Sequence, residues 1–495
     1  MNPSKKILIY SVAAVCSFTG VATAQTNKPA AKKDVKQQTQ KQSLANLPVD
    51  ANVRIGKLAN GFTYYIRKNV EPKDRAQLYL VNKIGSIVEN DDQQGLAHFM
   101  EHMSFNGTKN FPKNDLVNYL QKAGVRFGAD LNAYTSFDET VYQLPIPTDD
   151  AEIFKNGMQI MRDWAQDATL DPTEINKERG VVLEEKRLGK GAMQRMQTKY
   201  LPMLFNNSRY SKRLPIGTEE ILKNFKPETI RQFYSDWYRP DLQALIVVGD
   251  VDVNKVEQMI KTQFSTLKKP AKPRPRIKYT IPLLNKNQFK VVYDKEFPVT
   301  LAQIIIKHPE MVVKTTADLR NHMIISLYNQ MTGARFSELT KQANPPYLQG
   351  GASIGGFLAG LDAATTYVVA KPGELEKGFK TVLKETERIK RFGFVQTELD
   401  RAKTEFMTDQ ESAYKERDKT TSESFVNEYL QNFLTGEASP GIPYEYDFYK
   451  KNISGISLEE VNAIVKKYIT DVNRDVIIMG PEKDKDSLPD EATVN

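Results

Sequence analysis

The chain has 495 residues, with 69 Lys and Arg against 61 Asp and Glu, a formal net charge of +8 and a single cysteine. This length is sufficient for two or more domains. The charge excess is modest for the length and does not indicate nucleic-acid binding, and one cysteine excludes a disulfide framework.

The N-terminal 24 residues have the pattern of a secretory signal peptide. Lys5 and Lys6 provide a basic start, and residues 7–21 form an apolar run that is short for a membrane span. Residues 22–24, Ala-Thr-Ala, fit a cleavage site, and cleavage there would remove the only cysteine. The sequence therefore predicts export to the periplasm or the medium, without a transmembrane anchor in the mature protein.

A Pro-rich basic segment divides the rest of the chain. Residues 268–278 alternate Pro with Lys and Arg, which resists helix formation and predicts an extended linker. A basic run can also bind nucleic acid, but no aromatic residues or binding motif accompany this one, so no nucleic-acid partner is expected. The predicted organisation is a signal peptide (1–24), a flexible tether (25–45), a first module (46–267), the linker (268–278), a second module (279–482) and a disordered tail (483–495).

The first module alternates strand and helix patterns. Runs rich in Tyr, Ile, Val and Leu predict strands, and apolar residues at helical spacing predict helices. The predicted strands are 61–69, 76–89, 125–136, 140–146 and 242–248, and the predicted helices are 94–105, 113–123, 149–168, 172–188 and a last one ending near 264.

The second module repeats this order loosely. Its predicted strands are 289–293, 300–307 and 475–479, and its predicted helices are 316–331, several within 373–435, and 457–468. Each module closes on an apolar strand followed by glycine, which predicts a duplicated fold. The glycine-rich residues 350–356 lack the spacing of a phosphate-binding loop and predict a flexible bend or close backbone packing.

The sequence His98-Phe99-Met100-Glu101-His102 has the form H-x-x-E-H. Residues four apart share one face of a helix, so His98 and His102 can reach one metal ion. Glu101 lies near that face, where it can contact a metal-bound water. The alternative is a helix with two ordinary histidines and a solvated glutamate between them, although these are two of only four histidines in the chain.

A third metal ligand is needed, because catalytic zinc usually has three protein ligands and one open position. The helix predicted over 172–188 offers four carboxylates: Glu174, Glu178, Glu184 and Glu185. Glu178 and Glu185 are two turns apart and share a face. Spacing alone does not select the ligand, and all four side chains can instead be solvated carboxylates paired with neighbouring Lys and Arg.

The chain resembles the insulinase/pitrilysin family of zinc metallopeptidases. H-F-M-E-H is followed, after about 75 residues, by E-R-G-V-V-L-E-E at 178–185. The stretch N-A-Y-T-S-F-D-E-T-V-Y at 132–142 and the closing V-V-G-D at 247–250 are similar to the same family. Among its members, the chain most resembles the N-terminal half of long bacterial periplasmic peptidases.

The resemblance implies a fold and a metal site. The fold would be α+β, with two homologous modules, each a mostly antiparallel sheet packed with helices, together forming one half of a clam-shell peptidase. One Zn²⁺ per chain would be bound by His98, His102 and Glu178. Glu101 would act as general base on the water that zinc activates, and Glu185 would fix the orientation of a histidine.

The resemblance also implies a substrate-binding strand. A peptide would add as a strand beside Asn132 and Ala133, with main-chain hydrogen bonds that tolerate different sequences, and Tyr142 would contribute to the same region. The alternative is that Asn132 lies in an ordinary turn and that Tyr142 is a packed aromatic residue.

One position departs from the family pattern. The oxyanion-stabilising module of the family carries an Arg and, seven residues later, a Tyr, and the corresponding positions here are Thr340 and Tyr347. Thr cannot replace the charged, fork-shaped donor that Arg provides. We therefore expect a second peptidase-like half as partner, either a separate chain or a C-terminal segment missing from this sequence.

Two functions follow from these observations. The first is a zinc-dependent endopeptidase that hydrolyses peptides or small unfolded proteins and needs a second half for full activity. The second is a non-catalytic peptide-binding or assembly subunit of a two-part peptidase, although the full set of metal ligands and base argues against it.

Overall fold

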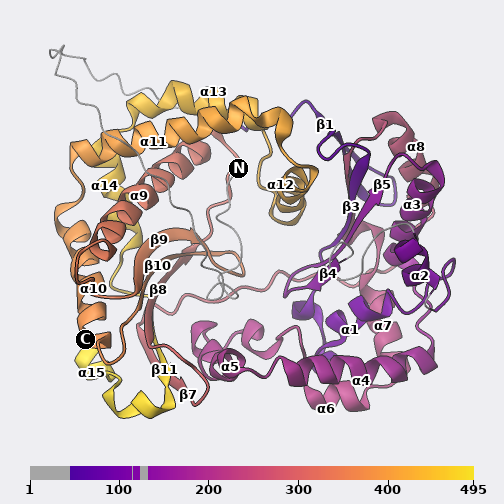
Figure 1. Cartoon of the computed structure of the whole chain (residues 1–495). Coiled ribbons are helices and arrows are strands. Elements are labelled where there is room, and N and C mark those ends of the chain that lie inside the picture. The colour runs from indigo at the N-terminus through magenta and orange to yellow at the C-terminus, as the bar shows by residue number, and fades with distance from the viewer. Residues whose placement is uncertain (1–44, 114, 123–131, 495) are drawn as a thin grey trace.

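The computed structural model describes residues 45–113, 115–122 and 132–494. The predicted signal peptide, nearly all of the predicted tether and part of the predicted strand 125–136 lie outside these residues. In the described part, no helix has the length and apolar character needed to span a membrane. Two β-sheets with helices packed on them (Figure 1) confirm the predicted α+β fold of two mostly antiparallel modules.

The first sheet has six strands: β1 (Val53–Lys57), β2 (Thr63–Lys68), β3 (Arg75–Asn82), β4 (Asn132–Thr135), β5 (Thr140–Pro147) and β6 (Gln243–Gly249). Their order is β1-β2-β6-β3-β5-β4, and β2–β6 is the parallel pair among antiparallel neighbours. β4 therefore forms an edge of this sheet.

The second sheet has five strands: β7 (Gln288–Asp294), β8 (Leu301–Pro309), β9 (Gln349–Gly356), β10 (Leu361–Val369) and β11 (Arg474–Pro481). Their order, β7-β11-β8-β10-β9, reproduces that of the first sheet without β1, including the parallel pair, here β7–β11. The matching order supports the predicted duplication.

The glycine-rich segment 350–356 lies in strand β9, so the expectation of a flexible bend was wrong. The expectation of close packing was correct. A Cβ on Gly350 would lie 2.9 Å from the ring of Tyr347, and one on Gly351 would lie 3.1 Å from the ring of Tyr367. The aromatic rings occupy the space that side chains would need, so a strand forms here despite the weak strand propensity of glycine.

The α-helices of the first module are α1 (Leu96–Met103), α2 (Asp115–Lys122), α3 (Ala151–Gln166), α4 (Pro172–Leu188), α5 (Ala192–Leu204), α6 (Glu219–Asn224), α7 (Pro227–Trp237) and α8 (Val253–Phe264). The bounds of α4 are those predicted, because its end signals are strong. Asp171 accepts hydrogen bonds from Thr173 N and Glu174 N, Pro172 occupies the first turn, and Gly189 follows the last residue.

The α-helices of the second module are α9 (Thr316–Thr340), α10 (Leu375–Phe392), α11 (Gln396–Lys415), α12 (Ser422–Thr435), α13 (Ile442–Asn452), α14 (Leu458–Tyr468) and α15 (Glu491–Val494). Short 3₁₀ helices are η1 (Ser86–Val88), η2 (Asp91–Gln93), η3 (Arg209–Lys212), η4 (Pro240–Leu242), η5 (Arg417–Lys419), η6 (Ile453–Gly455) and η7 (Glu482–Ser487). η7 and α15 differ from the disorder expected over 483–495, because Leu488 and Val494 pack against the core of the second module.

The first sheet has two buried faces. Leu78 and Leu80 of β3 face a core that includes α1, α3 and α8, whereas the alternating residues Tyr79 and Val81 face α12. α12 belongs in sequence to the second module, and Figure 1 shows it beside β3 of the first sheet.

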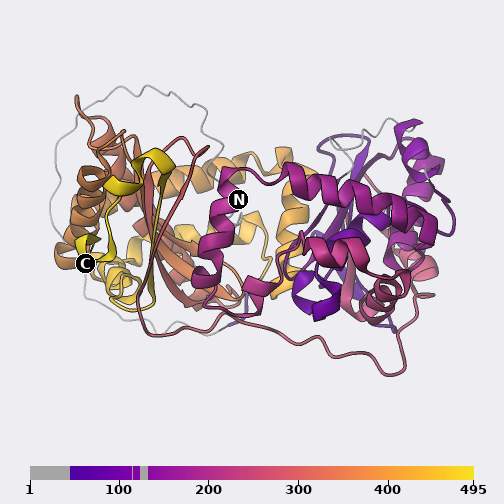
Figure 2. The same ribbon diagram turned by 90° about the horizontal axis from the view of Figure 1, so that it is seen from below.

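The second sheet also has one face covered by helices of its own module and the other face covered by a helix of the other module. Ile304 and Ile306 of β8 pack with α9, α10 and α14, whereas Leu301 and Ile305 belong to the core that includes α5 of the first module. Figure 2 shows α4 and α5 running as consecutive helices from the first sheet toward the second. Each module therefore contributes one helix to the sheet of the other.

The basic segment 268–278 contains no helix or strand and lies against the first module. Arg274 hydrogen-bonds Asp236 at 3.2 Å, and its guanidinium lies 4.8 Å from the Trp237 ring centroid. Arg276 donates to the carbonyl of Lys83 at 2.6 Å and to Asp138 at 3.1 Å. Both arginines are engaged within the protein.

Candidate metal centre

Helix α1 presents the two motif histidines on one face. It begins after Gly95, whose φ of 100° is unfavourable for other residues, and the Glu89 carboxylate accepts hydrogen bonds from Gly95 N and Ala97 N at 3.1 and 2.8 Å. The apolar residues of the helix, among them Phe99 and Met103, are buried in the first core. This packing leaves the opposite face, with both histidines, toward α4.

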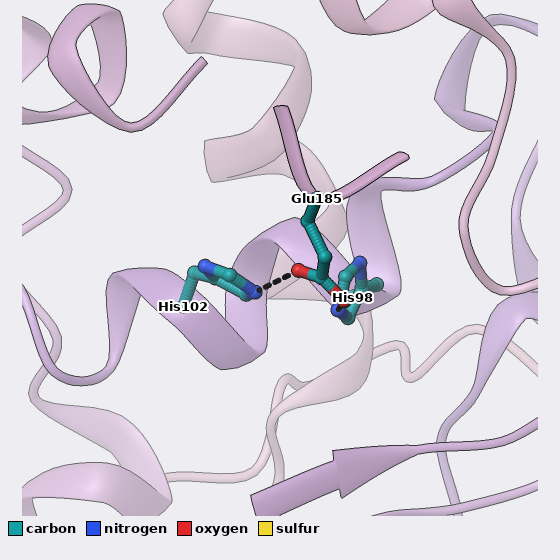
Figure 3. Close-up of side chains that lie close together, drawn as sticks. All are labelled: His98, His102 and Glu185. Carbon is teal, nitrogen blue, oxygen red and sulfur yellow. Dashed lines mark ion pairs between the residues drawn. The ribbon is translucent and has the colours of Figure 1, made fainter. Parts of the chain in front are cut away.

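His98, His102 and Glu185 come together in one cluster (Figure 3). Glu185 Oε2 lies 3.2 Å from His102 Nε2, and Glu185 Oε1 lies 3.6 Å from His98 Nε2. One ligand atom from each of the three residues falls within 4.8 Å of the others. Two imidazole nitrogens and a carboxylate oxygen are ligands suited to zinc.

Glu178 occupies a different place. Its Oε1 lies 2.7 Å from Nδ1 of His102, and its Oε2 accepts a hydrogen bond from Asn106 Nδ2 at 2.7 Å. Both oxygens of Glu178 are thus engaged on the Nδ1 side of the His102 ring, away from the Nε2 atom that Glu185 contacts. The side chain of Glu178 is 12% exposed, against 50% for that of Glu185. The geometry favours Glu185 as third ligand and Glu178 as the residue that orients a histidine, the reverse of the roles that the resemblance implied.

The two histidines have opposite protonation tendencies without a metal. Burial lowers the pKa of His102, but the hydrogen bonds to Glu178 and Glu185 outweigh it and raise the pKa to about 9. Burial, together with the charge of His102, lowers the pKa of His98 to about 4. Protonated His102 thus places a positive charge between the carboxylates of Glu178 and Glu185. A cation that binds to His102 Nε2 would displace the proton from that nitrogen.

Glu101, the predicted base, is buried beside this cluster. Its side chain is 8% exposed, and Oε2 accepts a hydrogen bond from Thr135 Oγ1 at 2.6 Å. Burial raises the pKa of Glu101 to about 7, against the opposing effect of the Thr135 hydrogen bond. A carboxylate with a pKa near neutrality is suited to accept and return a proton at physiological pH.

The predicted substrate residues fall into two groups. Asn132 and Ala133 lie on the edge strand β4, and Ala133 N donates to Asn132 Oδ1 at 3.0 Å. Tyr142 instead is fully buried, and its hydroxyl accepts from Ser104 Oγ at 3.0 Å and lies 2.8 Å from the Tyr238 hydroxyl. The expectation that Tyr142 contacts substrate does not fit this environment, because Tyr142 lies with Leu144 and Ile146 on the buried side of β5. The alternative of a packed aromatic residue fits.

Thr340, which departs from the family pattern, and Tyr347, which matches it, both form hydrogen bonds within the second module. Tyr347 is fully buried and donates to the carbonyl of Phe336 at 3.1 Å, and Thr340 Oγ1 donates to the carbonyl of Ser337 at 2.8 Å. Both side chains are thus bonded within their own module, so neither is directed at an oxyanion elsewhere.

Two residues near the site were not identified from the sequence. Asn106 follows His102 by four positions, and this helical spacing is a signal that could have found it. Thr135 is 34 residues from Glu101, and only the packing of β4 against α1 brings them together.

The chain matches two models of one peptidase family. Residues 64–214 match the family model described as Insulinase (Peptidase family M16), and residues 224–406 match the model described as Peptidase M16 inactive domain. A protein of Arabidopsis thaliana described as "Zinc protease PQQL-like" is 31% identical over 416 residues, which cover 84% of this chain and 41% of that protein.

The solved structures that match include the first half of the periplasmic protease PqqL from Escherichia coli, with a TM-score of 0.85, 28% identity, and coverage of 91% of this chain and 96% of that one. Against the periplasmic protease PqqL itself the TM-score is 0.84, and this chain covers 50% of it. The chain spans between 32% and 41% of the length of the first three curated relatives that it matches.

Proposed function

Because this chain belongs to the insulinase family, peptidase family M16, we propose that it is a zinc-dependent endopeptidase acting on peptides or small unfolded proteins. The observation that carries the proposal is the convergence of His98, His102 and Glu185 beside the buried carboxylate of Glu101. The relatives described as zinc proteases support it.

We propose one zinc ion per chain, bound by Nε2 of His98, Nε2 of His102 and the carboxylate of Glu185. The hydrogen bond between His102 Nδ1 and Glu178 supports this assignment, because it holds the proton on Nδ1 and leaves the Nε2 lone pair for a metal. Bound there, zinc would supply a Lewis acid that makes water nucleophilic at neutral pH.

In the proposed reaction Glu101 carries the proton. Its carboxylate accepts a proton from the attacking water and returns it to the nitrogen of the leaving amine as the peptide bond breaks. The burial that raises its pKa toward 7 makes both transfers feasible at one pH. Glu178 acts through His102, whose ring it orients.

Zinc binding tests the assignment of the third ligand. Glu185→Gln should lower zinc affinity by more than the roughly 10- to 100-fold typical of a residue that only orients a ligand, and Glu178→Gln should fall within that range. The two affinities can be measured by competition with a chromogenic chelator. In the active assembly, chelation should abolish peptide cleavage and added zinc should restore it. A larger loss for Glu178→Gln would reverse the assignment, and cleavage that persists without metal would refute the function.

We also propose that substrate peptides add to the free edge of β4. Ala133 N donates to Asn132 Oδ1 in an exposed contact, and a peptide carbonyl would replace this side chain as the acceptor. Ala133→Pro removes this donor where an edge strand tolerates proline, and should raise KM about 5- to 10-fold with kcat retained. Ala133→Ser, which keeps the N–H, is the matched control. An unchanged KM in the proline variant would exclude main-chain pairing at this position.

Full activity is proposed to need a second peptidase-like half. The buried Tyr347 and the short Thr340 support this, since neither supplies an oxyanion donor, and PqqL of Escherichia coli contains about as much chain again beyond the matched part. Turnover of the isolated chain at the rate of the combined halves would contradict it. Zinc and peptide binding without cleavage, even with a second half, would instead favour a non-catalytic subunit.

A further inference from the structure

The edge strand and the proposed base are joined by one hydrogen bond, from Thr135 Oγ1 to Glu101 Oε2 at 2.6 Å. We propose that Thr135 is a positioning residue: it fixes one oxygen of the Glu101 carboxylate so that the other is left to exchange protons. The inference rests on the proposed function, because it assigns the base a partner within that same site.

The carboxylate of Glu101 needs such a partner. The terminal torsion of a glutamate is broad, so an unheld carboxylate rotates among orientations. Among the described residues, Thr135 provides the hydrogen bond to this carboxylate, and Glu101 is only 8% exposed. A hydrogen bond to a charged group is stronger where water is excluded, so this single contact is sufficient to select one orientation.

Thr135 is itself held in place. It pairs with Thr140 across β4 and β5, and their hydroxyl oxygens are 3.3 Å apart. Thr140 Oγ1 donates its proton to the carbonyl of Ile84 at 2.8 Å, which leaves the Thr135 proton for Glu101. The turn that follows is closed by Ser136 N donating to Glu139 O at 2.8 Å. The donor therefore sits at a fixed position in the sheet.

This arrangement links the strand to the base. Thr135 ends β4, the strand on which Asn132 and Ala133 are proposed to receive the peptide. A single four-residue element thus carries both the proposed peptide edge and the hydroxyl that orients the base. A displacement of β4 would move both together.

Kinetics of three single variants and one double variant test the role in the active assembly. Thr135→Val keeps the shape and strand preference of the residue but removes the donor, and should lower kcat about 10- to 100-fold with little change in KM or zinc content. Thr135→Ser should restore most of kcat. Thr63→Val, in β2 and separated from β4 by three strands, is the matched control and should keep the parental kcat. In a Glu101→Gln background, Thr135→Val should have no further effect.

A crystal structure of Thr135→Val provides a test that does not depend on activity. The Glu101 carboxylate should occupy more than one orientation there and a single one in the parent and in Thr135→Ser. A single, unchanged orientation in Thr135→Val would overturn the positioning role even if no variant cleaves peptides. An unchanged kcat in Thr135→Val would overturn it while leaving the proposed peptidase function intact, whereas a parent that binds zinc without cleaving would count against that function alone.

Discussion

A Glu101→Gln variant is expected to keep its zinc and to lose kcat by about 100-fold or more. Gln has nearly the same shape as Glu but cannot accept the proton of the attacking water. Glu101 lies outside the proposed ligand set of His98, His102 and Glu185, so zinc affinity should change little. Peptide turnover is measured in the active assembly, together with metal content, so that loss of the base is separated from loss of the metal.

Glu184→Gln is the matched control for this substitution. Glu184 lies on α4 next to Glu185, but its side chain is 52% exposed and pairs with Arg187 at 2.6 Å rather than with the histidines. This variant should retain the parental kcat. Zinc-loaded Glu101→Gln with parental turnover would eliminate Glu101 as the base.

A Lys307→Met variant is expected to lose much of the free energy of unfolding of the protein. Lys307 and Asp475 form an ion pair at 2.7 Å with both side chains 1% exposed. Lys307 Nζ also donates to the carbonyl of Leu204 at 2.8 Å and to Asn206 Oδ1 at 3.0 Å. Lys307→Met should therefore lower the free energy of unfolding by about 3–5 kcal/mol, because it leaves Asp475 buried without its counter-charge. Denaturant unfolding followed by fluorescence measures the loss.

Two further variants make the stability result specific. Lys380→Met removes a lysine that is 71% exposed and should change the free energy of unfolding by no more than about 0.5 kcal/mol. The double variant Lys307→Met/Asp475→Leu should recover part of the loss, because no unpaired charge remains in the interior. If Lys307→Met destabilised no more than the surface control, the ion pair would not hold the end of α5 against the second sheet.

Much of the metal site could be predicted because its signals are local. H-x-x-E-H places His98 and His102 on one helical face whatever the surroundings, and the caps at Asp171 and Gly189 define the helix that carries the carboxylates. The choice between Glu178 and Glu185 as third ligand depends on tertiary packing rather than on a local signal. Both lie on the same face of α4, and the crossing of α1 over α4 decides which one reaches the Nε2 atoms and which one reaches Nδ1 of His102.

The burial of Tyr142, the duplication of the sheets and the exchange of helices between modules differ in how far the sequence indicates them. Tyr142 has the residue type of a substrate contact, but α3 and the neighbouring elements bury it. The alternation along β5, in which Tyr142, Leu144 and Ile146 are apolar and buried, was a signal of this burial. The loosely repeated order of elements along the chain and the glycine after each closing strand were readable from the sequence, whereas the order of the strands within each sheet was not. The exchange of α5 and α12 was not readable either, because an amphipathic helix shows that it has an apolar face but not which sheet that face covers.

The reciprocal covering of the sheets has a consequence for the order in which the protein can fold during synthesis. The face of the first sheet that carries Tyr79 and Val81 stays without its helix until α12 has been translated, after four of the five strands of the second sheet. Conversely, α5 is made before any strand of the sheet that it covers. A nascent chain cut off at the linker would present an apolar sheet face and an unpaired apolar helix to the chaperones of its compartment, so the two modules are coupled in biogenesis as one folding unit.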